Sequence, residues 1–394
     1  MSLQLGIIGK PNVGKSTFFT ALTMHEIEIA SYPFTTINPN VGVGYVRNPC
    51  PHTILGKECN PRNSICMKGI RFVPVEVIDV AGLVPGAHEG RGLGNKFLDD
   101  LRQAHGFILV IDASGSTDSE GNIGKVGEFD PTEDIKFVRE EIVEWFKSII
   151  GKNWHRLARR VETEHGDIAK VLAKILSGVG IKYHEIKAVL RDFDEKPTKW
   201  SEEDLKEISR RLLDIAKPMV VAANKADQAP EDLLKKLIGM EDFKVIPCSA
   251  LYEYTLKKAS MNGYIEYIPG SDDFKILKEL NEKQRKALER IREFMQRFGG
   301  TGVQKILEEM VFNSLGYIIV YPVEDENRWC DKDGNVLPDA YLMPPGSTAL
   351  DLAYRVHTEI GEKFVRAIDA KTKKILGRDY VLRMGDVIKI VAHR

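Results

Sequence analysis

The sequence predicts an α/β protein with a doubly wound, mostly parallel sheet, a helical insertion and a smaller C-terminal α+β domain. Residues 70–78 are strand-like, the apolar runs at 106–112, 218–223 and 243–247 are typical of buried parallel strands, and polar residues follow each segment. Strands that alternate with helices in this way form a sheet that binds its ligands at the carboxyl edge. From residue 316 onward, the pattern changes to short strands separated by turns.

Length and composition limit the class of protein. A chain of 394 residues exceeds one ordinary domain, and 43% apolar with 29% charged residues is typical of a globular protein with an ample core. The net charge of −1 gives no overall signal for nucleic acid or membrane. A core strand begins almost at the N-terminus, which leaves no room for a signal peptide, and no apolar run has the length of a membrane span. Five cysteines do not suggest a secreted disulfide framework, so we expect a cytoplasmic protein. We also expect a monomer.

A phosphate-binding loop follows the first apolar run. The pattern G-x-x-x-x-G-K-[ST] stands between a predicted strand and a predicted helix, where backbone N–H groups and the helix N-terminus can cradle phosphates. Lys15 can then reach the β- and γ-phosphates, and the Ser16 hydroxyl can bind Mg²⁺. We expect nucleoside triphosphate contacts from Gly9, Lys10, Pro11, Asn12, Val13, Gly14, Lys15, Ser16 and Thr17.

Two further segments are expected to complete the magnesium and γ-phosphate site. Asp79 ends a predicted strand and begins a D-x-x-G pattern, so its carboxylate can hold Mg²⁺ and the Gly82 N–H can sense the γ-phosphate. Thr35 and Thr36 lie in the loop before the next strand, and Thr36 is our choice as the threonine that binds Mg²⁺ and closes over the γ-phosphate. Lys15, Thr36 and Gly82 are therefore the expected catalytic residues.

The base-reading residues follow two later strands. In Asn224-Lys225-Ala226-Asp227, the Asp227 carboxylate can accept hydrogen bonds from N1–H and the 2-amino group of guanine, which adenine lacks as donors. The Ser249-Ala250 segment can supply a backbone N–H to guanine O6. All the pieces in order, each after a strand, predict a GTP-binding domain.

The sequence also raises doubts about catalysis. Leu83 stands where a water-orienting glutamine would be expected, and an aliphatic side chain cannot orient water, so we expect slow hydrolysis. Asn12 either coordinates K⁺, which would offset charge in the transition state, or is a structural residue of the loop.

Cysteines and a histidine gather in the segment 47–69, which has little periodicity and is expected to be a loop. Cys50, His52, Cys59 and Cys66 could form a tetrahedral zinc site, but their spacing lacks the usual C-x₂-C knuckle. Free thiols or a Cys59–Cys66 disulfide are therefore favoured over zinc at this stage.

The interval between the strands at 106–112 and 218–223 is about a hundred residues long, whereas a whole βαβ unit takes roughly thirty. Its apolar spacing predicts a helical insertion, with Asp130 and Pro131 as a helix start. Residues 147–191 hold ten Lys or Arg against four Asp or Glu, with Trp154 and Tyr183 interleaved. This stretch is either an RNA-binding surface or a solvated helix face.

The C-terminal part is expected to contain short strands around one amphipathic helix at 349–360, on which His357 is interpreted as a packing or capping residue. We expect three parts: a nucleotide-binding domain at 1–114 and 217–315, a helical insertion at 115–216, and a C-terminal domain at 316–394.

These motifs resemble those of the Obg superfamily. The resemblance lies in Tyr32-Pro33-Phe34-Thr35-Thr36-x-x-Pro39-Asn40, the run from Asp79 to Ala87 and the glycine-rich run 90–94. The stretches 301–304, 320–325 and 336–340 are similar to the archaeal form of the YchF branch. The stretches 345–357 and 385–388 resemble a TGS domain, a ubiquitin-like β-grasp module that threonyl-tRNA synthetases and stringent-response synthetases share.

The resemblance implies a slow, Mg²⁺-dependent nucleotide hydrolase that acts as a switch on ribosome or RNA partners, through the insertion and the TGS domain. Many YchF proteins have a degraded base-reading motif and prefer ATP, whereas the motif is intact here, so we expect GTP with ATP as the alternative. An RNA- or ribosome-binding module that keeps its nucleotide as a structural ligand is the competing hypothesis, and Leu83 favours it.

Overall fold

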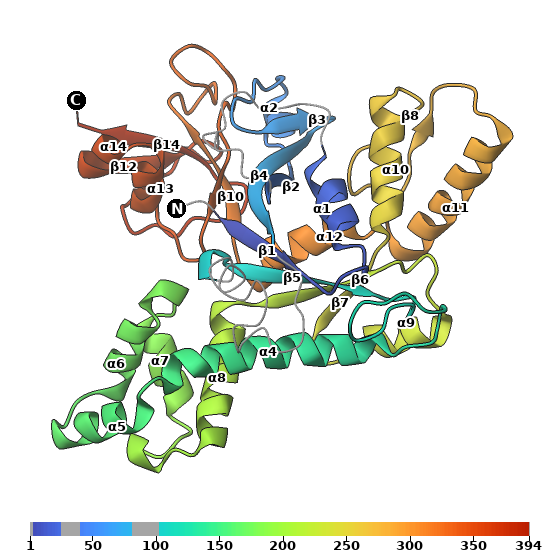
Figure 1. Ribbon diagram of the computed structural model, residues 1–394. Helices are drawn as coiled ribbons and strands as arrows, with labels where there is room; N and C mark the ends of the chain where they lie inside the picture. The colour runs from blue at the N-terminus through green and yellow to red at the C-terminus, as the bar shows by residue number, and fades with distance from the viewer. Residues whose placement is uncertain (1–2, 25–39, 81–101, 394) are drawn as a thin grey trace.

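The computed structural model describes residues 3–24, 40–80 and 102–393 (Figure 1). Its centre is a seven-stranded sheet in the order β2–β4–β1–β5–β6–β7, with β3 also paired to β4. Strands β4, β1, β5, β6 and β7 run parallel, and β2 and β3 pair antiparallel with β4, which confirms a mostly parallel sheet. The strands are β1 (Gln4–Ile8), β2 (Val41–Pro49), β3 (Ile65–Met67), β4 (Ile70–Asp79), β5 (Gly106–Asp112), β6 (Met219–Asn224) and β7 (Lys244–Pro247).

The sheet separates two hydrophobic cores. Phe107, Leu109 and Ile111 of β5 belong to the core that includes helix α4 (Pro131–Gly151), while Ile108 and Val110 belong to the core on the opposite face. This alternation follows from the two-residue period of a strand. All of these β5 side chains are buried because helices cover both faces, so the strand is a continuous apolar run.

The helical insertion begins along the sheet and ends in a separate lobe. In Figure 1, α4 runs along the lower side of the strands and the lobe lies at its left end. Helix α4 begins as expected, because Asp130 caps it through the Thr132 N–H and Pro131 occupies its first turn. The lobe contains α5 (Trp154–Thr163), α6 (Ile168–Ile175), α7 (Tyr183–Leu190) and α8 (Glu202–Ala216), and α8 leads back to β6.

Four helices follow the return to the sheet. Helix α10 (Ala250–Met261) packs against α1 (Lys15–Thr23), and α10 and α11 (Glu282–Phe298) stand as a pair at the right of Figure 1. A short ladder of β8 (Ile265–Glu266) and β9 (Lys275–Ile276) joins them. Helix α9 (Glu231–Ile238) connects β6 and β7, and α12 (Val303–Glu308) continues into a π-helical turn at Glu309–Ser314.

The C-terminal domain has a five-stranded sheet in the order β11–β10–β14–β12–β13. The predicted single helix at 349–360 is wrong in one respect, because the chain breaks it into α13 (Ala349–Val356) and α14 (Thr358–Glu362). His357 lies at the break in extended conformation, and its Nδ1 accepts the Glu359 N–H, so its capping role is confirmed. The strands are β10 (Ile318–Val323), β11 (Tyr341–Met343), β12 (Phe364–Asp369), β13 (Ile375–Leu376) and β14 (Val387–Ala392).

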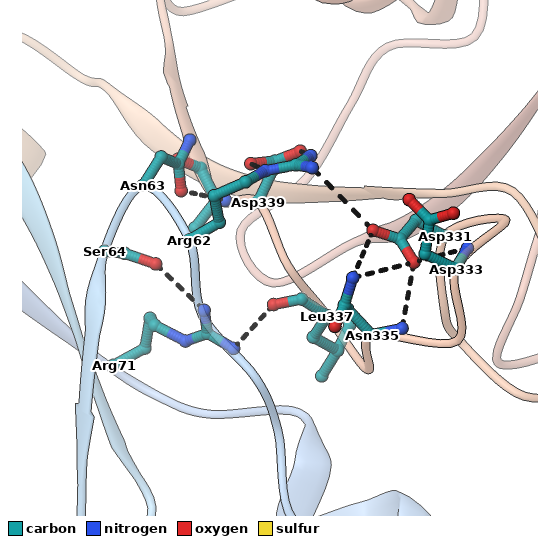
Figure 2. A network of polar contacts seen from close by, with 10 residues as sticks. Arg62, Asn63, Ser64, Arg71, Asp331, Asp333, Asn335, Leu337 and Asp339 are labelled. Atoms are coloured by element: carbon teal, nitrogen blue, oxygen red, sulfur yellow. Dashed lines mark hydrogen bonds and ion pairs between the residues drawn. The ribbon is translucent and has the colours of Figure 1, made fainter. Parts of the chain in front are cut away.

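The segment 47–69 has more structure than its sequence suggests. It contains the end of β2, the short helix α2 (His52–Leu55) and strand β3, and it contacts the C-terminal domain. Figure 2 shows this contact, in which Arg71 and residues 62–64 meet the loop 331–339. The two regions lie more than two hundred and fifty residues apart in the chain, so sequence pattern could not predict that they meet.

Among the described residues, no helix combines the length and the apolar character that crossing a membrane requires.

Candidate functional site

The phosphate loop joins β1 to α1 at the carboxyl edge of the sheet. Asn12 and Gly14 adopt left-handed backbone angles, with φ of 63° and 89°. Two features exclude a side chain at Gly14. A Cβ there would lie 2.4 Å from Nδ2 of Asn224, and the left-handed backbone angle would be strained for a residue other than glycine. The loop backbone and the base-reading motif are therefore in direct contact.

Lys15 and Asp79 face each other across this loop. Asp79 ends β4, and the parallel register of β4 with β1 places it beside Ile7, immediately before the loop. The Lys15 ammonium forms an ion pair with the Asp79 carboxylate, and both side chains are largely buried. Ser16 follows in the first turn of α1. The structure thus brings together the predicted phosphate-binding lysine and two of the predicted magnesium ligands.

Lys10 has a different environment from the one expected for a phosphate contact. Its side chain is 2% exposed, and its Nζ lies 2.6 Å from Oδ1 of Asp134 on α4 and 2.6 Å from the carbonyl oxygen of Asp118. Burial raises the pKa of Asp134, although hydrogen bonding from Lys10 opposes the rise. Only the backbone of Lys10 is therefore available to contact a phosphate. Its side chain links the phosphate loop to α4.

Asn224 and Lys225, the first two residues of the base-reading motif, form hydrogen bonds to the backbone of the phosphate loop. Nδ2 of Asn224 donates to the Val13 carbonyl at 2.9 Å, and Nζ of Lys225 donates to the Asn12 carbonyl at 2.9 Å. Oδ1 of Asn224 accepts the Ala250 N–H at 3.0 Å. These contacts link three loops that lie at the ends of three strands.

Asp112 is a site residue that the sequence reasoning missed. It ends β5, is 1% exposed, and lies 2.8 Å from Nζ of Lys225. Burial opposes its ionisation, but hydrogen bonds from Lys225, Ser114 and Ser116 prevail and lower its pKa. A carboxylate directly after an apolar strand at the carboxyl edge was the available signal.

Asp227 lies at the mouth of the base-reading loop. The Asp227 side chain is half-buried. Burial raises the pKa values of Cys248 and Tyr252, and the negative charge of Asp227 raises them further. Ser249 caps α10 by accepting the Tyr252 N–H. The Ala226 N–H donates to the Cys248 carbonyl at 3.1 Å, so the loops that carry Asp227 and Ser249 are neighbours, and their guanine contacts stay a prediction.

Asn12 contacts the segment that follows β5. Its Nδ2 donates to the Gly121 carbonyl at 3.0 Å, while no hydrogen bond within the described ranges uses its Oδ1. That amide oxygen is the atom a K⁺ ion would need.

Thr35, Thr36, Gly82 and Leu83 lie outside the described residues. Their expected roles in binding Mg²⁺, sensing the γ-phosphate and failing to orient water stay predictions.

The cysteine and histidine residues of the segment 47–69 converge on one point. The ligand atoms of Cys50, His52, Cys59 and Cys66 all lie within 4.8 Å of one another. The disulfide alternative is wrong for this structure, because Cys59 and Cys66 are both free. The sequence raised these four residues as a possible zinc site, and the chain reversal through α2 and β3 brings them together without the usual knuckle spacing.

The basic stretch of the insertion is exposed, but one of its aromatic residues is not. Trp154 is 4% exposed and stacks on Trp200 at 5.3 Å, so it belongs to the core of the lobe and cannot stack on a nucleobase. Tyr183 lies at the surface, where its hydroxyl donates to Asp167 at 2.6 Å. The exposed Lys and Arg residues of this stretch are Lys152, Arg156, Arg159, Arg160, Lys170, Lys174, Lys182, Lys187 and Arg191.

Three family models match successive parts of the chain. The model of a 50S ribosome-binding GTPase matches residues 4–148. The model of the G4 motif-containing domain of YGR210-like, Obg-like GTPases matches residues 222–325, and the TGS domain model matches residues 332–392.

Individual proteins match along the whole length. A GTP-binding protein of Methanocaldococcus jannaschii is 55% identical over 393 residues, which is 99% of each chain. The ribosome-binding ATPase YchF of Bacillus subtilis is 27% identical over 413 residues, which is 98% of each chain. The crystal structure of a GTP-binding protein from Pyrococcus horikoshii OT3 has a TM-score of 0.79 at 39% identity, and covers 99% of this chain and 100% of that one.

Proposed function

Because this chain belongs to the Obg superfamily of P-loop GTPases, in its YchF-type form with a C-terminal TGS domain, we propose that it binds GTP and hydrolyses it slowly with Mg²⁺. Its nucleotide state would act as a switch on a ribosome- or RNA-containing partner. We also propose the division into a nucleotide-binding domain at 1–114 and 217–315, an insertion at 115–216 and a TGS domain at 316–394.

The observation that carries the proposal is the joining of the phosphate loop to an intact base-reading motif. Asn224 and Lys225 hold the carbonyls of Val13 and Asn12, so the loop that would cradle the phosphates and the motif that would read the base form one unit. Asp227 then has the chemistry to choose guanine, since adenine has no donors at N1 and C2.

The residues present fit a magnesium ion. The Lys15–Asp79 ion pair supports this, because it places a carboxylate beside the loop at the point where phosphates would enter. When a triphosphate binds, Lys15 would turn to the phosphate oxygens and leave Asp79 and Ser16 free to hold the ion, with Thr36 as the third ligand. Bound Mg²⁺ would offset the negative charge of the β- and γ-phosphates.

The choice between GTP and ATP is tested by competition. Labelled GTP bound to the full chain should be displaced by unlabelled GTP at a concentration about a hundredfold lower than by ATP, because a wrong base leaves buried polar groups unpaired. Equal displacement, or better displacement by ATP, would contradict the proposal and favour the ATPase activity that the name of the Bacillus subtilis relative gives.

A partner surface is supported by the helical lobe. Exposed Lys and Arg side chains occur on each of α5, α6 and α7, and Arg160 with Glu164 is their one ion pair in the described part of the chain. Exposed Lys and Arg side chains bind phosphate backbones irrespective of base sequence. Trp154 is buried, so it cannot stack on a base. The name of the relative from Bacillus subtilis makes the ribosome the first partner to test.

Phosphate release decides between a switch and a structural ligand. The full chain alone should hydrolyse GTP slowly, and ribosomes should make the turnover at least about tenfold faster. The ribosome would do so by supplying a charged group to the transition state or by fixing the attacking water. The second candidate function is an RNA-binding module with a permanently bound nucleotide, which Leu83 favours. It predicts ribosome binding with no GTP turnover in either condition.

A further inference from the structure

A set of metal-ligating side chains lies away from the nucleotide site, between the sheet and the C-terminal domain. Cys50 follows β2, His52 begins α2, Cys59 lies in the loop after α2, and Cys66 lies on β3. Their ligand atoms all lie within 4.8 Å of one another, and nothing in the nucleotide-binding chemistry uses them.

The distances match those of a tetrahedral zinc site. With Zn–S bonds of about 2.3 Å and Zn–N bonds of about 2.0 Å, two sulfurs lie about 3.8 Å apart, and a sulfur and a nitrogen about 3.5 Å apart. In the structure, the Sγ atoms of Cys50 and Cys59 are 3.8 Å apart. Nδ1 of His52 lies 3.2 Å from Sγ of Cys59 and 3.6 Å from Sγ of Cys66.

The surrounding charge also fits. Three thiolates and one neutral imidazole on Zn²⁺ carry a net charge of −1, which needs a buried cation nearby. Arg71 is 0% exposed, and its Nε and Nη2 both lie 3.4 Å from Sγ of Cys50. Within the described ranges no carboxylate forms an ion pair with Arg71, so a metal-bound thiolate would supply its counter-charge.

The segment that holds these ligands is also the one that meets the C-terminal domain. The N–H groups of Asn60 and Arg62 donate to the carbonyls of Val336 and Pro338 at 2.9 and 2.7 Å. In Figure 2, Arg71 lies between Ser64 and the Leu337 carbonyl, to which it donates at 2.9 and 3.0 Å. Further contacts join Asn63 to Ala340 and Arg62 to Asp339.

We propose that Cys50, His52, Cys59 and Cys66 bind one structural zinc ion that fixes residues 50–66 in the conformation that docks on the C-terminal domain. A closed set of four protein ligands leaves no position for a substrate, as in structural rather than catalytic sites. The metal would add to the few buried contacts of this segment, since α2 has four residues and none of them is buried. The proposal does not depend on nucleotide binding or hydrolysis.

Elemental analysis of the full chain, purified with reductant and without chelator, is the direct test. We expect about one zinc and no iron per chain, and a cobalt-substituted sample with the intense visible bands and thiolate charge-transfer band of a tetrahedral site. Cys59→Ser and Cys66→Ser should each lower the zinc content at least about tenfold. The matched control is Cys330→Ser, which removes a buried cysteine of the C-terminal domain and should keep the metal.

Two measurements on the wild-type chain keep the test valid if the serine variants do not fold. A mercurial reagent should release the zinc in step with the modification of three thiols, as a colorimetric chelator reports. Hydrogen exchange at the amides of Asn60 and Arg62 should accelerate at least about tenfold when the zinc is withdrawn, and slow again when zinc is restored.

The zinc site and its role in docking are contradicted by different results. Absence of stoichiometric zinc after purification and after reconstitution, iron in its place, or zinc retained by both serine variants overturns the site. A disulfide among these cysteines in the reduced, metal-supplemented protein also overturns it. Zinc without any change of exchange at Asn60 and Arg62 overturns its role in docking.

Discussion

The side-chain amide of Asn224 donates a hydrogen bond to the carbonyl of Val13, across 211 residues of sequence. Its oxygen accepts the Ala250 N–H, so one side chain joins the phosphate loop, the base-reading strand and the start of α10. Lys225 adds a second link, to Asn12 and Asp112. Asn224 and Lys225 thus support the phosphate loop, which leaves the proposed base reading to Asp227 of the same motif.

Lys225 and Asp227 should therefore affect different properties of binding. Lys225→Met removes charge-assisted hydrogen bonds worth about 1.5–3 kcal/mol, so it should weaken GTP binding about tenfold or more and leave the preference for GTP over ATP unchanged. Asp227→Ala should reduce that preference about a hundredfold. Titration with a fluorescent GTP analogue, with unlabelled competitors, measures both. Loss of base preference in Lys225→Met would contradict the division of roles.

Lys10 should matter for folding more than for binding. Lys10→Met leaves the buried Asp134 carboxylate without its partner, so the free energy of unfolding should fall by about 3–5 kcal/mol. Urea denaturation followed by circular dichroism measures this. The control is Lys136→Met, which breaks a solvent-exposed pair with Glu133 and should leave the free energy of unfolding nearly unchanged. Equal stability of the two variants would show that the Lys10–Asp134 pair does not anchor the loop.

Asn12 provides a test of cation dependence. If its Oδ1, which accepts no hydrogen bond from the described residues, binds K⁺ near the phosphates, GTP turnover should be about tenfold faster in K⁺ than in Na⁺ at equal ionic strength. Asn12→Ala should remove this difference while turnover in Na⁺ stays the same. A wild-type chain with equal turnover in both salts would make Asn12 a structural residue, held by Gly121.

Lys217 predicts a change of stability at alkaline pH. Its ammonium is buried between the carbonyls of Arg102 and Ala104, and burial lowers its pKa from 10.5 to about 8. Between these values the unfolded chain holds a proton that the folded chain lacks, so the free energy of unfolding should rise with pH, by up to about 3 kcal/mol. Falling pH removes this contribution as it passes through about 8.

The difference between wild type and Lys217→Met isolates this effect from other titrating groups. Urea denaturation from about pH 7 to about pH 10.5 should show the wild type gaining stability relative to the variant. The exposed control Lys136→Met should keep the wild-type profile. Parallel curves for wild type and Lys217→Met would mean that the Lys217 pKa is not lowered in the folded protein.

Local signals in the sequence were enough for the sheet and for the binding motifs. The β5 run, the glycine pattern of the phosphate loop and the Asp130 cap are each determined by neighbours within one element. Contacts between distant elements were not accessible. Lys10 was assigned to the phosphates because its position lies in the loop, and the charge that instead holds it is on α4, 124 residues away.

The same reason explains why Trp154 was placed on the basic surface, and why the convergence of the cysteine and histidine residues was not evident from their spacing. Trp154 alternates with basic residues in the sequence, but the helix turns it inward onto Trp200. A short helix and a loop separate Cys50 from Cys66, which lies on β3, so only the folded chain brings their sulfurs together. Spacing rules describe ligands within one loop, and this cluster takes them from several elements.

The contact of Arg71 with the Leu337 carbonyl also has a consequence for synthesis. The core on this face of the sheet includes Leu5 and Val75 from the start of the chain and Leu337 and Val387 from its end. During translation the first strands would emerge with this face uncovered, because Leu337 and Val387 follow Val75 by more than two hundred and fifty residues. Such long sequence separations slow folding, so the nascent N-terminal half is expected to depend on protection by a chaperone.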